Sequence, residues 1–208
     1  MNEQELFWSG SFGDAYTVRN DCVSFNNLSF FINIFSFIND KSELNSLLEI
    51  GCNNGCNLKA IHMLRPKMKL TGVDINNYAC SGLEHHKWLN VINASIFDDH
   101  VLEPHDIVLC KGFLIHINPN DYDIVFEKIY NSSNKYIIIA EYYSKICRPI
   151  NYRTFDNKLW SNDFFSEFKM RYNDIQLVEY GFVYHRDEVN PQDDLTWFLI
   201  KKVSSSVI

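Results

Sequence analysis

Residues 47–58 read LLEIGCNNGCNL, an apolar run that reaches an acid and then breaks at two glycines before a helical pattern resumes. Glycine is used where the chain needs a positive φ or where another group must approach the backbone closely. Gly51 and Gly55 follow directly after a predicted strand, where α/β sheets place ligands against the main chain. The stretch therefore predicts a ligand-binding turn.

The chain around this turn is long enough for one domain with a sizeable core. It has 208 residues, of which 46% are hydrophobic, and a net charge of −7. The negative charge argues against nucleic acid as a partner, because nucleic-acid binders carry clustered basic surfaces. No stretch approaches the ~20 apolar residues that span a bilayer, and the N-terminus MNEQELFWSG lacks the pattern of a secretory signal. We expect a cytoplasmic protein without a membrane partner.

The cysteines give no sign of a metal site. Six are scattered along the chain without paired zinc-site spacing: Cys22, Cys52, Cys56, Cys80, Cys110 and Cys147. A cytoplasmic protein keeps such thiols reduced, so they are expected mainly as small buried apolar side chains. Cys52 and Cys56 are close in the turn, but they lack the Cys-x-x-Cys spacing of a redox pair.

Strand-like runs alternate with helical patterns from residue 46 onward. The runs are SLLEI, KLTGVDI, VINAS, DIVLCK and KYIIIAEYY, and the helical patterns are NLKAIHML, YACSGLEHHKWL and DYDIVFEKIY. This alternation gives βαβ units, which form a mainly parallel sheet with helices on both faces, a Rossmann-like α/β architecture. Two further strands, 175–186 and 195–203, follow each other without a helix, so they are predicted to form an antiparallel hairpin at the sheet edge.

Two segments precede the first strand. In 21–40, Phe25, Leu28, Ile32 and Phe35 recur at three- and four-residue spacing, which predicts an amphipathic helix packed on the core. Upstream, 8–20 reads WSGSFGDAYTVRN and is predicted to precede any regular element. We expect it to form a lid over the ligand or a surface arm pinned by its aromatic residues.

Three ligands compete for the glycine turn. A P-loop needs four residues between its glycines and then Lys-Ser/Thr, and residues 51–58 have neither feature. The dinucleotide fingerprint places glycines at positions one, three and six, whereas this turn has them at one and five. S-adenosylmethionine fits better, because it has no pyrophosphate and needs only room for its ribose and methionine portion beside the turn.

Two later segments add to this interpretation. Asp74 ends the second predicted strand, where an acid can accept hydrogen bonds from both ribose hydroxyls, although it could instead be a plain helix N-cap. After the third strand come Ser95, Ile96 and Phe97, which place a polar contact and two apolar side chains where an adenine ring would lie. Ordinary core packing explains Ile96 and Phe97 equally well.

These features resemble class I S-adenosylmethionine-dependent methyltransferases. More narrowly, the chain resembles the family called pseudaminic acid biosynthesis-associated methylases, in the blocks FWSGSFGDAYTVRN, KGFLIHINP, IIIAEYYS and YGFVYHRDEVNPQDDLTWFLIKK. The similarity runs over nearly the whole chain, and the departures in the turn are Cys52, Asn54 and Cys56. The resemblance implies a seven-stranded sheet, S-adenosylmethionine as cofactor, and a sugar-nucleotide or surface-glycan substrate without fixing the acceptor.

Candidate cofactor-binding residues follow from the turn, the strand ends and this resemblance. They are Tyr16, Arg19, Gly51, Asn53, Gly55, Asp74, Ile75, Ser95, Ile96, Phe97 and Lys111. Arg19 and Tyr16 would meet the methionine carboxylate from the lid segment. Candidate substrate-binding residues are Asp14, Tyr142, Tyr143, Arg153 and Asp193, with Arg153 in an insertion that interrupts the strand and helix alternation at 147–160. A solvated arginine explains Arg153 equally well.

His116 is the candidate general base. It follows the DIVLCK strand at the edge where open α/β sheets bind ligands, and an unperturbed pKa of about 6.5 suits proton removal near neutrality. A hydrogen-bonded structural histidine is the alternative. Glu141, at the end of KYIIIAEYY, could act as base, orient the histidine or bind substrate. The other histidines are less informative; His85 and His86 are predicted on an exposed helix.

The sequence thus predicts a single domain over 1–208. Its parts are a lid segment and helix (1–40), a cofactor-binding core (46–142), an acceptor-side insertion and helix (143–174) and a C-terminal hairpin (175–203). The predicted function is O-methylation of a sugar hydroxyl, on a nucleotide-linked sugar for capsule or other surface polysaccharide. The alternatives are a non-catalytic nucleotide- or sugar-binding module and an NAD-dependent sugar oxidoreductase.

Overall fold

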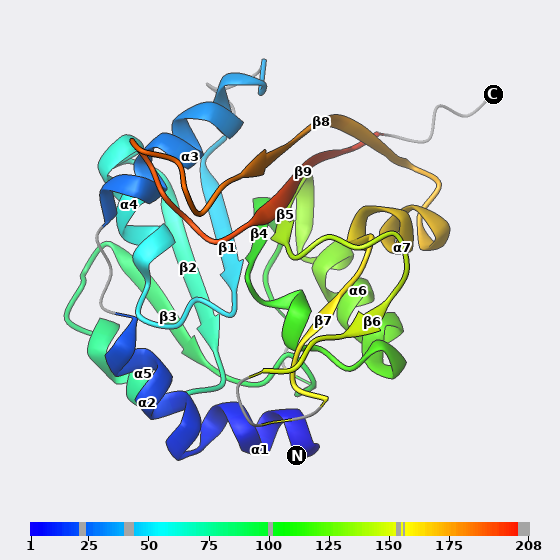
Figure 1. The fold of residues 1–208 in the computed structure, drawn as a ribbon. Helices are drawn as coiled ribbons and strands as arrows, with labels where there is room; N and C mark the ends of the chain where they lie inside the picture. Colours follow the sequence, from blue (N-terminus) through cyan, green and yellow to red (C-terminus); the bar gives the residue numbers. More distant parts are fainter. Residues whose placement is uncertain (21–23, 40–43, 100–101, 153–154, 156, 204–208) are drawn as a thin grey trace. The chain divides into compact units, whose positions relative to one another are not determined.

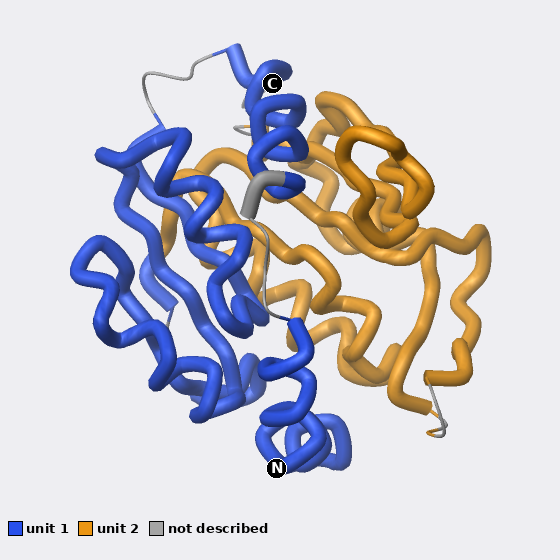
Figure 2. Tube along the Cα trace, turned by 60° about the vertical axis from the view of Figure 1, so that its left-hand side comes forward, with its two compact units in different colours: residues 1–103 blue, residues 104–208 orange. Residues whose placement is uncertain are grey.

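The computed structural model describes residues 1–20, 24–39, 44–99, 102–152, 155 and 157–203. The chain forms two compact units, residues 1–103 and 104–208 (Figure 2). Each unit is described by itself below. The organisation as a single methyltransferase domain stays a prediction.

The first unit is built on three parallel strands. They are β1 (Ser46–Ile50), β2 (Lys69–Asp74) and β3 (Leu89–Asn93), with β2 in the middle. Two helices connect them, α4 (Cys56–Leu64) and α5 (Asn77–Leu83) (Figure 1). Because the strands are parallel, Gly51, which follows β1, and Asp74, which ends β2, lie at the same edge of this sheet. These strands confirm the βαβ prediction.

The N-terminal segment is helical, so the prediction that 8–20 precedes any regular element is wrong. It forms α1 (Glu3–Ser9) and α2 (Ser11–Arg19), which meet at Gly10. Helix α1 begins with a capping box, in which the Asn2 side chain accepts from the Glu5 N–H and the Glu5 carboxylate accepts from the Asn2 N–H. The aromatic residues pack between the two helices, with Phe7 and Phe12 stacked at 4.1 Å. Because the aromatic residues pack on one another, neither α1 nor α2 shows the single periodic apolar face by which a helix is identified in a sequence.

Helix α3 (Ser24–Ser36) confirms the predicted helix, whereas its predicted face is confirmed at Phe35 and wrong at Ile32; Leu28 is half-buried, and the Phe25 side chain lies outside the described residues. Ile32 is 57% exposed, whereas Phe31 and Ile34 are fully buried. The buried set is Phe30, Phe31, Ile34, Phe35 and, just past the helix, Ile38. Both faces of this segment carry apolar side chains, so spacing alone does not select the one that packs on the core.

Helix α5 is shorter than predicted. It ends at Leu83, and His85 and His86 lie in the turn that follows, so their prediction as helical is wrong. The His86 N–H donates to Leu83 O at 3.0 Å, which closes this turn. The chain must leave the helix here because Leu89 pairs with Leu70 in the sheet.

The second unit contains two parallel strands and an antiparallel hairpin. The parallel pair is β4 (His105–Lys111) and β5 (Ser133–Glu141), and the hairpin is β8 (Ile175–Val183) with β9 (Leu195–Lys202), paired antiparallel to each other and, through β9, to β5. This confirms the predicted C-terminal hairpin. Gly181 faces Trp197 across the hairpin, and a Cβ there would lie 2.6 Å from the indole ring.

Short elements fill the rest of the second unit. They are η2 (Leu114–His116), η3 (Pro119–Asp121), α6 (Tyr122–Asn131), α7 (Phe164–Arg171), and the small antiparallel pair β6 (Arg148–Pro149) and β7 (Trp160–Ser161). The pair β6 and β7 lies within the insertion that the sequence predicted after the fifth strand.

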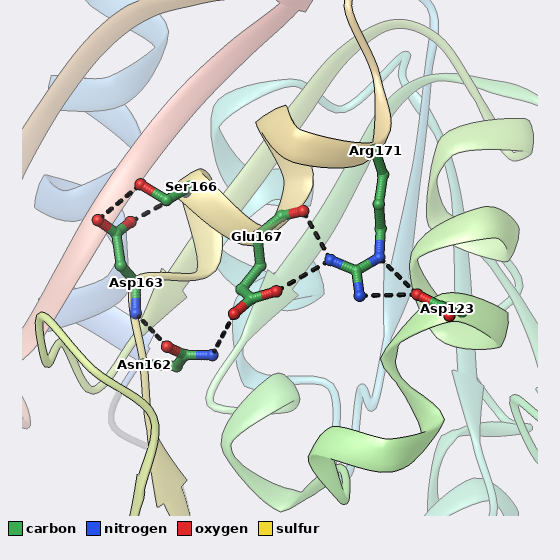
Figure 3. A network of polar contacts seen from close by, with 6 residues as sticks. All are labelled: Asp123, Asn162, Asp163, Ser166, Glu167 and Arg171. Atoms are coloured by element: carbon green, nitrogen blue, oxygen red, sulfur yellow. Dashed lines mark hydrogen bonds and ion pairs between the residues drawn. The ribbon is translucent and has the colours of Figure 1, made fainter.

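A polar network fastens α7 (Figure 3). The Arg171 guanidinium bonds Glu167 on its own helix at 2.9 Å and Asp123 on α6 at 2.7 Å. The Glu167 carboxylate also accepts from the Asn162 amide at 3.2 Å. Asp163 caps α7 by accepting from the Ser166 N–H at 3.0 Å. Because Asn162 directly follows β7, the network ties α6 and α7 to the end of the small hairpin.

The strand order is β3-β2-β1-β4-β5-β9-β8, a seven-stranded sheet. Within this sheet, three of the pairings named above are parallel and two are antiparallel, which confirms the predicted mainly parallel sheet with an antiparallel end. None of the helices in the described ranges has the length and apolar composition needed to cross a membrane.

Candidate active site

The glycine turn has three residues in the left-handed region. Gly51 (φ 76°) and Gly55 (φ 71°) use the freedom that glycine provides, and Asn53 (φ 45°) is one of the two non-glycine residues with positive φ in the described chain. The Gly51 N–H donates to Val73 O at 2.8 Å, and the Gly55 N–H donates to Cys52 O at 2.8 Å. The turn is therefore closed by main-chain bonds of its own and to the end of β2.

Asp74 is fixed beside this turn. Its Oδ2 accepts from the Asn53 N–H at 2.7 Å, and its Oδ1 accepts from the Asn76 N–H at 2.8 Å. The cap of α5 is Asn76, whose side chain accepts from the Ala79 N–H at 2.8 Å, so the alternative role of Asp74 as helix cap is excluded. Burial raises the pKa of Asp74, while its main-chain donors act in the opposite direction. A carboxylate offers about four acceptor positions, of which the Asn53, Asn76 and Ile75 N–H groups use a part, and a ligand hydroxyl can use what remains.

The segment after β3 lies beside Asp74. The Asn93 side chain donates to Asp74 O at 2.9 Å. Ser95 holds the following turn, because its N–H donates to Asp98 and its hydroxyl accepts from the Phe97 N–H at 3.1 Å. Ile96 is 6% exposed, whereas Phe97 and, after β2, Ile75 are half-buried. Ile75 and Phe97 thus keep apolar surface that a flat ring can cover.

The N-terminal helices contact the loops of this site. Asp14 Oδ1 accepts from the Asn76 side chain at 2.8 Å, so this candidate substrate residue is bonded to the loop after β2. Tyr16 packs edge-on against Trp8 at 5.2 Å. Arg19 is exposed, with its guanidinium 5.6 Å from the Phe12 ring, and Asn20 O accepts from the Asn54 side chain of the glycine turn.

Glu141 organises the chain around η2 in the second unit. Its side chain is buried, and it accepts from the N–H groups of Phe113 (3.0 Å), Leu114 (2.9 Å) and Ile115 (3.4 Å). Burial raises its pKa to about 7, although these donors and the Lys111 ammonium favour the ionised form. The carboxylate therefore fixes the turn that carries His116.

His116 is held in one tautomer. Its Nδ1 lies 3.1 Å from Lys158 O, and a carbonyl oxygen can only accept, so Nδ1 carries the proton and the lone pair is on Nε2. Burial lowers the pKa of His116 to about 4, partly offset by the bond to Lys158 O. The ring also meets Tyr152 edge-on at 5.8 Å. The expectation of an unperturbed pKa near 6.5 is therefore wrong: at neutral pH the residue is a neutral imidazole with its lone pair on Nε2, but burial makes it a weaker base than a solvent-exposed histidine.

Glu141 and His116 give stability opposite pH dependences. Folding raises the Glu141 pKa from 4.5 to about 7, so folded protein binds the extra proton and the free energy of unfolding falls as pH rises through this window. Folding lowers the His116 pKa from 6.5 to about 4, so the unfolded chain binds the extra proton and the free energy of unfolding rises with pH. Between pH 4.5 and pH 6.5 the two groups therefore change the free energy of unfolding in opposite directions.

Replacing Glu141 by glutamine is expected to remove one of these effects. Glutamine keeps an acceptor for the Phe113 and Leu114 N–H groups but does not titrate. The free energy of unfolding of Glu141→Gln minus that of wild type should increase with pH, by up to about 1.4 kcal/mol per pH unit between about pH 5 and pH 6.5. Urea unfolding across this range measures the difference. The control Glu188→Gln, which changes an exposed side chain, should show the same dependence of the free energy of unfolding on pH as wild type. The same pH dependence in wild type, Glu141→Gln and Glu188→Gln would contradict the raised Glu141 pKa.

The remaining predicted site residues are less closely organised. Lys111 ends β4, and its charge acts on Glu141. Tyr142 is half-buried and its carbonyl accepts from the Asn162 N–H at 3.2 Å, while Tyr143 is 49% exposed. Asp193 is exposed, and it is the neighbouring Asp194 that binds the His185 ring, at 2.8 Å. Arg153 lies outside the described residues.

Sequence reasoning missed three contributors to the site. Asn76 links Asp74 to the N-terminal helices, and its place two residues after the strand-end acid was a usable signal for a helix cap. Lys158 and Asn20 act through main-chain carbonyls, which any residue could supply. No side-chain pattern could have identified these two.

The described part of the chain gathers no group of three histidine, cysteine or acidic side chains that could hold a metal. Among the described cysteines, Cys52, Cys80, Cys110 and Cys147 are not disulfide-bonded, whereas Cys56 is. The prediction that all six thiols are reduced is therefore wrong at Cys56. Spacing in the sequence does not determine which thiols the fold brings within bonding distance.

Comparison with solved structures identifies the fold. The chain resembles 1,6-didemethyltoxoflavin-N1-methyltransferase from Burkholderia thailandensis, with S-adenosylhomocysteine bound, at a TM-score of 0.67 and 14% identity over 97% of this chain and 87% of that one. It resembles magnesium protoporphyrin IX methyltransferase from Synechocystis PCC 6803 at a TM-score of 0.67 and 10% identity, over 96% and 100%. It resembles the plantazolicin methyltransferase BpumL at a TM-score of 0.66 and 15% identity, over 96% of this chain and 95% of that one.

No known family profile and no curated protein matches the sequence. The narrower resemblance to pseudaminic acid biosynthesis-associated methylases therefore stays a prediction. The solved structures, together with the strand order, show that the chain has the class I methyltransferase fold, a Rossmann-like seven-stranded sheet ending in an antiparallel strand pair, as the sequence predicted.

Proposed function

We propose that this protein is an S-adenosylmethionine-dependent O-methyltransferase that acts on a sugar hydroxyl, on a nucleotide-linked sugar destined for a surface polysaccharide such as a capsule. The proposal joins the class I methyltransferase fold, the chemistry of the glycine turn and the resemblance of four sequence blocks to sugar-pathway methylases. It assigns the enzyme to the cytoplasm, where sugar nucleotides are made, although the disulfide at Cys56 is unusual for that compartment.

The 2.7 Å bond from the Asn53 N–H to the Asp74 carboxylate carries the choice of cofactor. In dinucleotide-binding turns the third position is a glycine that lets the backbone approach the pyrophosphate. Here that position is Asn53, which has a side chain and whose N–H is committed to Asp74. The third position of this turn is thus occupied in holding a carboxylate that can accept from a ribose diol, and it does not serve the approach of a pyrophosphate. S-adenosylmethionine has the diol and lacks the pyrophosphate.

The residues present fit this cofactor. Asp74 would accept from the ribose diol with the acceptor capacity that its main-chain donors leave. Ile75 and Phe97 would cover the adenine ring, with the buried Ile96 packing behind them and Ser95 as polar contact. Gly51 and Gly55 would let the methionine portion lie against the turn, and Lys111, Tyr16 and Arg19 would meet its charged end. The cofactor supplies a methyl group already activated by positive sulfur.

The protein must still align an acceptor oxygen and accept its proton. Alignment can lower the barrier by roughly 7 kcal/mol or more, and a positioned base adds about 10²- to 10⁴-fold in rate. We assign proton removal to His116 Nε2, because the bond from Nδ1 to Lys158 O puts the lone pair there. Glu141 is assigned to positioning, because it holds the η2 turn that carries His116.

The acceptor assignment rests on the sequence blocks and on the candidate substrate residues within or next to them. Tyr142 and Tyr143 follow β5, and rings of this kind pack well against the apolar faces of sugars. Asp14 and Asp193 would accept hydrogen bonds from sugar hydroxyls, and Arg153 would meet the diphosphate of a sugar nucleotide.

Calorimetry followed by a transfer screen tests the proposal. The protein is expected to bind S-adenosylhomocysteine and to show no heat with NADH. With methyl-labelled S-adenosylmethionine and a panel of sugar nucleotides, label should enter at least one sugar, and NMR would locate the new O-methyl group. Binding of NADH alone would favour a sugar oxidoreductase. Binding of S-adenosylhomocysteine without transfer to any sugar would overturn the acceptor class but keep the cofactor.

A further inference from the structure

Asn76 uses every polar group it has. Its main-chain N–H donates to Asp74 Oδ1 at 2.8 Å and its side-chain oxygen accepts from the Ala79 N–H at 2.8 Å. Its amide nitrogen donates to Trp8 O at 3.1 Å and to Asp14 Oδ1 at 2.8 Å. An asparagine side chain has two N–H donors, and both are used on the N-terminal helices. One 3% exposed residue thus joins the Asp74 loop to α1 and α2.

The N-terminal helices approach this residue very closely. At Gly13 on α2, a Cβ would lie 1.9 Å from Trp8 O and 2.8 Å from the Asn76 amide nitrogen. Real Cβ atoms do not come so near to a backbone oxygen, so the approach requires glycine at this position. The contact between α1, α2 and Asn76 is therefore a specific fit.

A second contact links the same helices to the glycine turn. Asn20 directly follows α2, and its carbonyl accepts from the Asn54 side chain. The two loops that α1 and α2 touch, 51–55 and 74–76, are also the two that carry the Asn53 to Asp74 bond. Any shift of the helices is transmitted to both sides of that bond.

We propose that Asn76 is a positioning residue that couples the docking of α1 and α2 to cofactor binding. The inference rests on the proposed function, because it takes the Asp74 carboxylate as the ribose site. Cofactor binding and helix docking are then linked equilibria, so each strengthens the other by the same factor. The N-terminal helices close over the site by docking on Asn76.

Asn76→Ser tests the coupling. Serine keeps the cap of α5 but cannot donate to Trp8 O and Asp14 together. In wild type, S-adenosylhomocysteine should slow amide hydrogen exchange in residues 3–19. In Asn76→Ser this protection should disappear, and the dissociation constant measured by calorimetry should rise by about 10-fold, within the usual range of such couplings.

Two further variants separate coupling from loss of stability. Asp163→Ser makes a matching change at the cap of α7, and it should leave affinity and the exchange of 3–19 unchanged. Asn76→Asp places a carboxylate against Asp14 and should weaken binding by about 30-fold or more. Adding Asp14→Asn restores a donor and acceptor pair with the roles exchanged, and it should recover most of this loss.

The outcomes decide between the two proposals. If wild type binds S-adenosylhomocysteine and Asn76→Ser binds it equally well with unchanged protection of 3–19, the coupling is overturned and the cofactor assignment stands. A double variant no better than Asn76→Asp would also overturn it. If wild type does not bind S-adenosylhomocysteine, the proposed function fails, and the coupling fails with it.

Discussion

Asp74→Ala is expected to weaken the binding of S-adenosylhomocysteine by at least about 100-fold, because hydrogen bonds to a charged acceptor contribute about 1.5–3 kcal/mol each and two ribose hydroxyls would lose theirs. The same change leaves the Asn53 and Asn76 N–H groups without their acceptor, so the glycine turn loses a contact as well. Calorimetry with the full chain measures the loss.

Two variants make this result specific. The asparagine of Asp74→Asn has nearly the same shape as aspartate, but its NH₂ group must face a main-chain donor. Its loss of affinity for S-adenosylhomocysteine is therefore expected to be smaller than that of Asp74→Ala. Asp99→Ala removes an exposed acid from the segment after β3 and should bind like wild type. Circular dichroism and urea unfolding check that each variant is folded. An Asp74→Ala protein that is folded and binds within about three-fold of wild type would remove the ribose assignment.

His116→Ala is expected to lower methyl transfer by about 10²- to 10⁴-fold while the affinity for S-adenosylhomocysteine stays within a few-fold of wild type. The physical reason is that this residue would act on the acceptor proton and not on the cofactor. The assay uses labelled S-adenosylmethionine with the sugar nucleotide found by the transfer screen. Single-turnover measurement keeps product release from masking the loss.

The pH profile gives an independent check on His116. Burial lowers the pKa of His116 to about 4. The titration of this group should therefore leave kcat/KM constant through neutral pH and lower it only below about pH 5. NMR titration of the ring should place its pKa in the same region. The control is His185→Ala, an exposed histidine paired with Asp194, which should transfer methyl normally. Transfer by His116→Ala at the wild-type rate would assign proton removal to another group.

Local patterns were sufficient for most of the secondary structure. The strands β1, β2, β4 and β5 and the helices α4 and α6 agree with the predicted segments to within two residues at each end. Each of these segments is a short run with a clear period or a continuous apolar core, bounded by turn residues, so neighbours in the chain determine it. Helices α1 and α2 were missed because their aromatic residues pack on one another across Gly10, without one periodic stripe.

The sequence by itself determined the alternating α/β architecture, the antiparallel end of the sheet, and the glycine turn with Asp74 at the next strand end. All of these depend on spacing along the chain. Only the tertiary structure decided which face of α3 is buried, that Glu141 holds the η2 turn, which ring nitrogen of His116 carries the proton, and that Asn76 joins Asp74 to the N-terminal helices. The Lys158 carbonyl is 42 residues from His116, and Asp14 is 62 residues from Asn76. Partners so far apart meet only when the chain folds, and several of them act through main-chain atoms that every residue has in common.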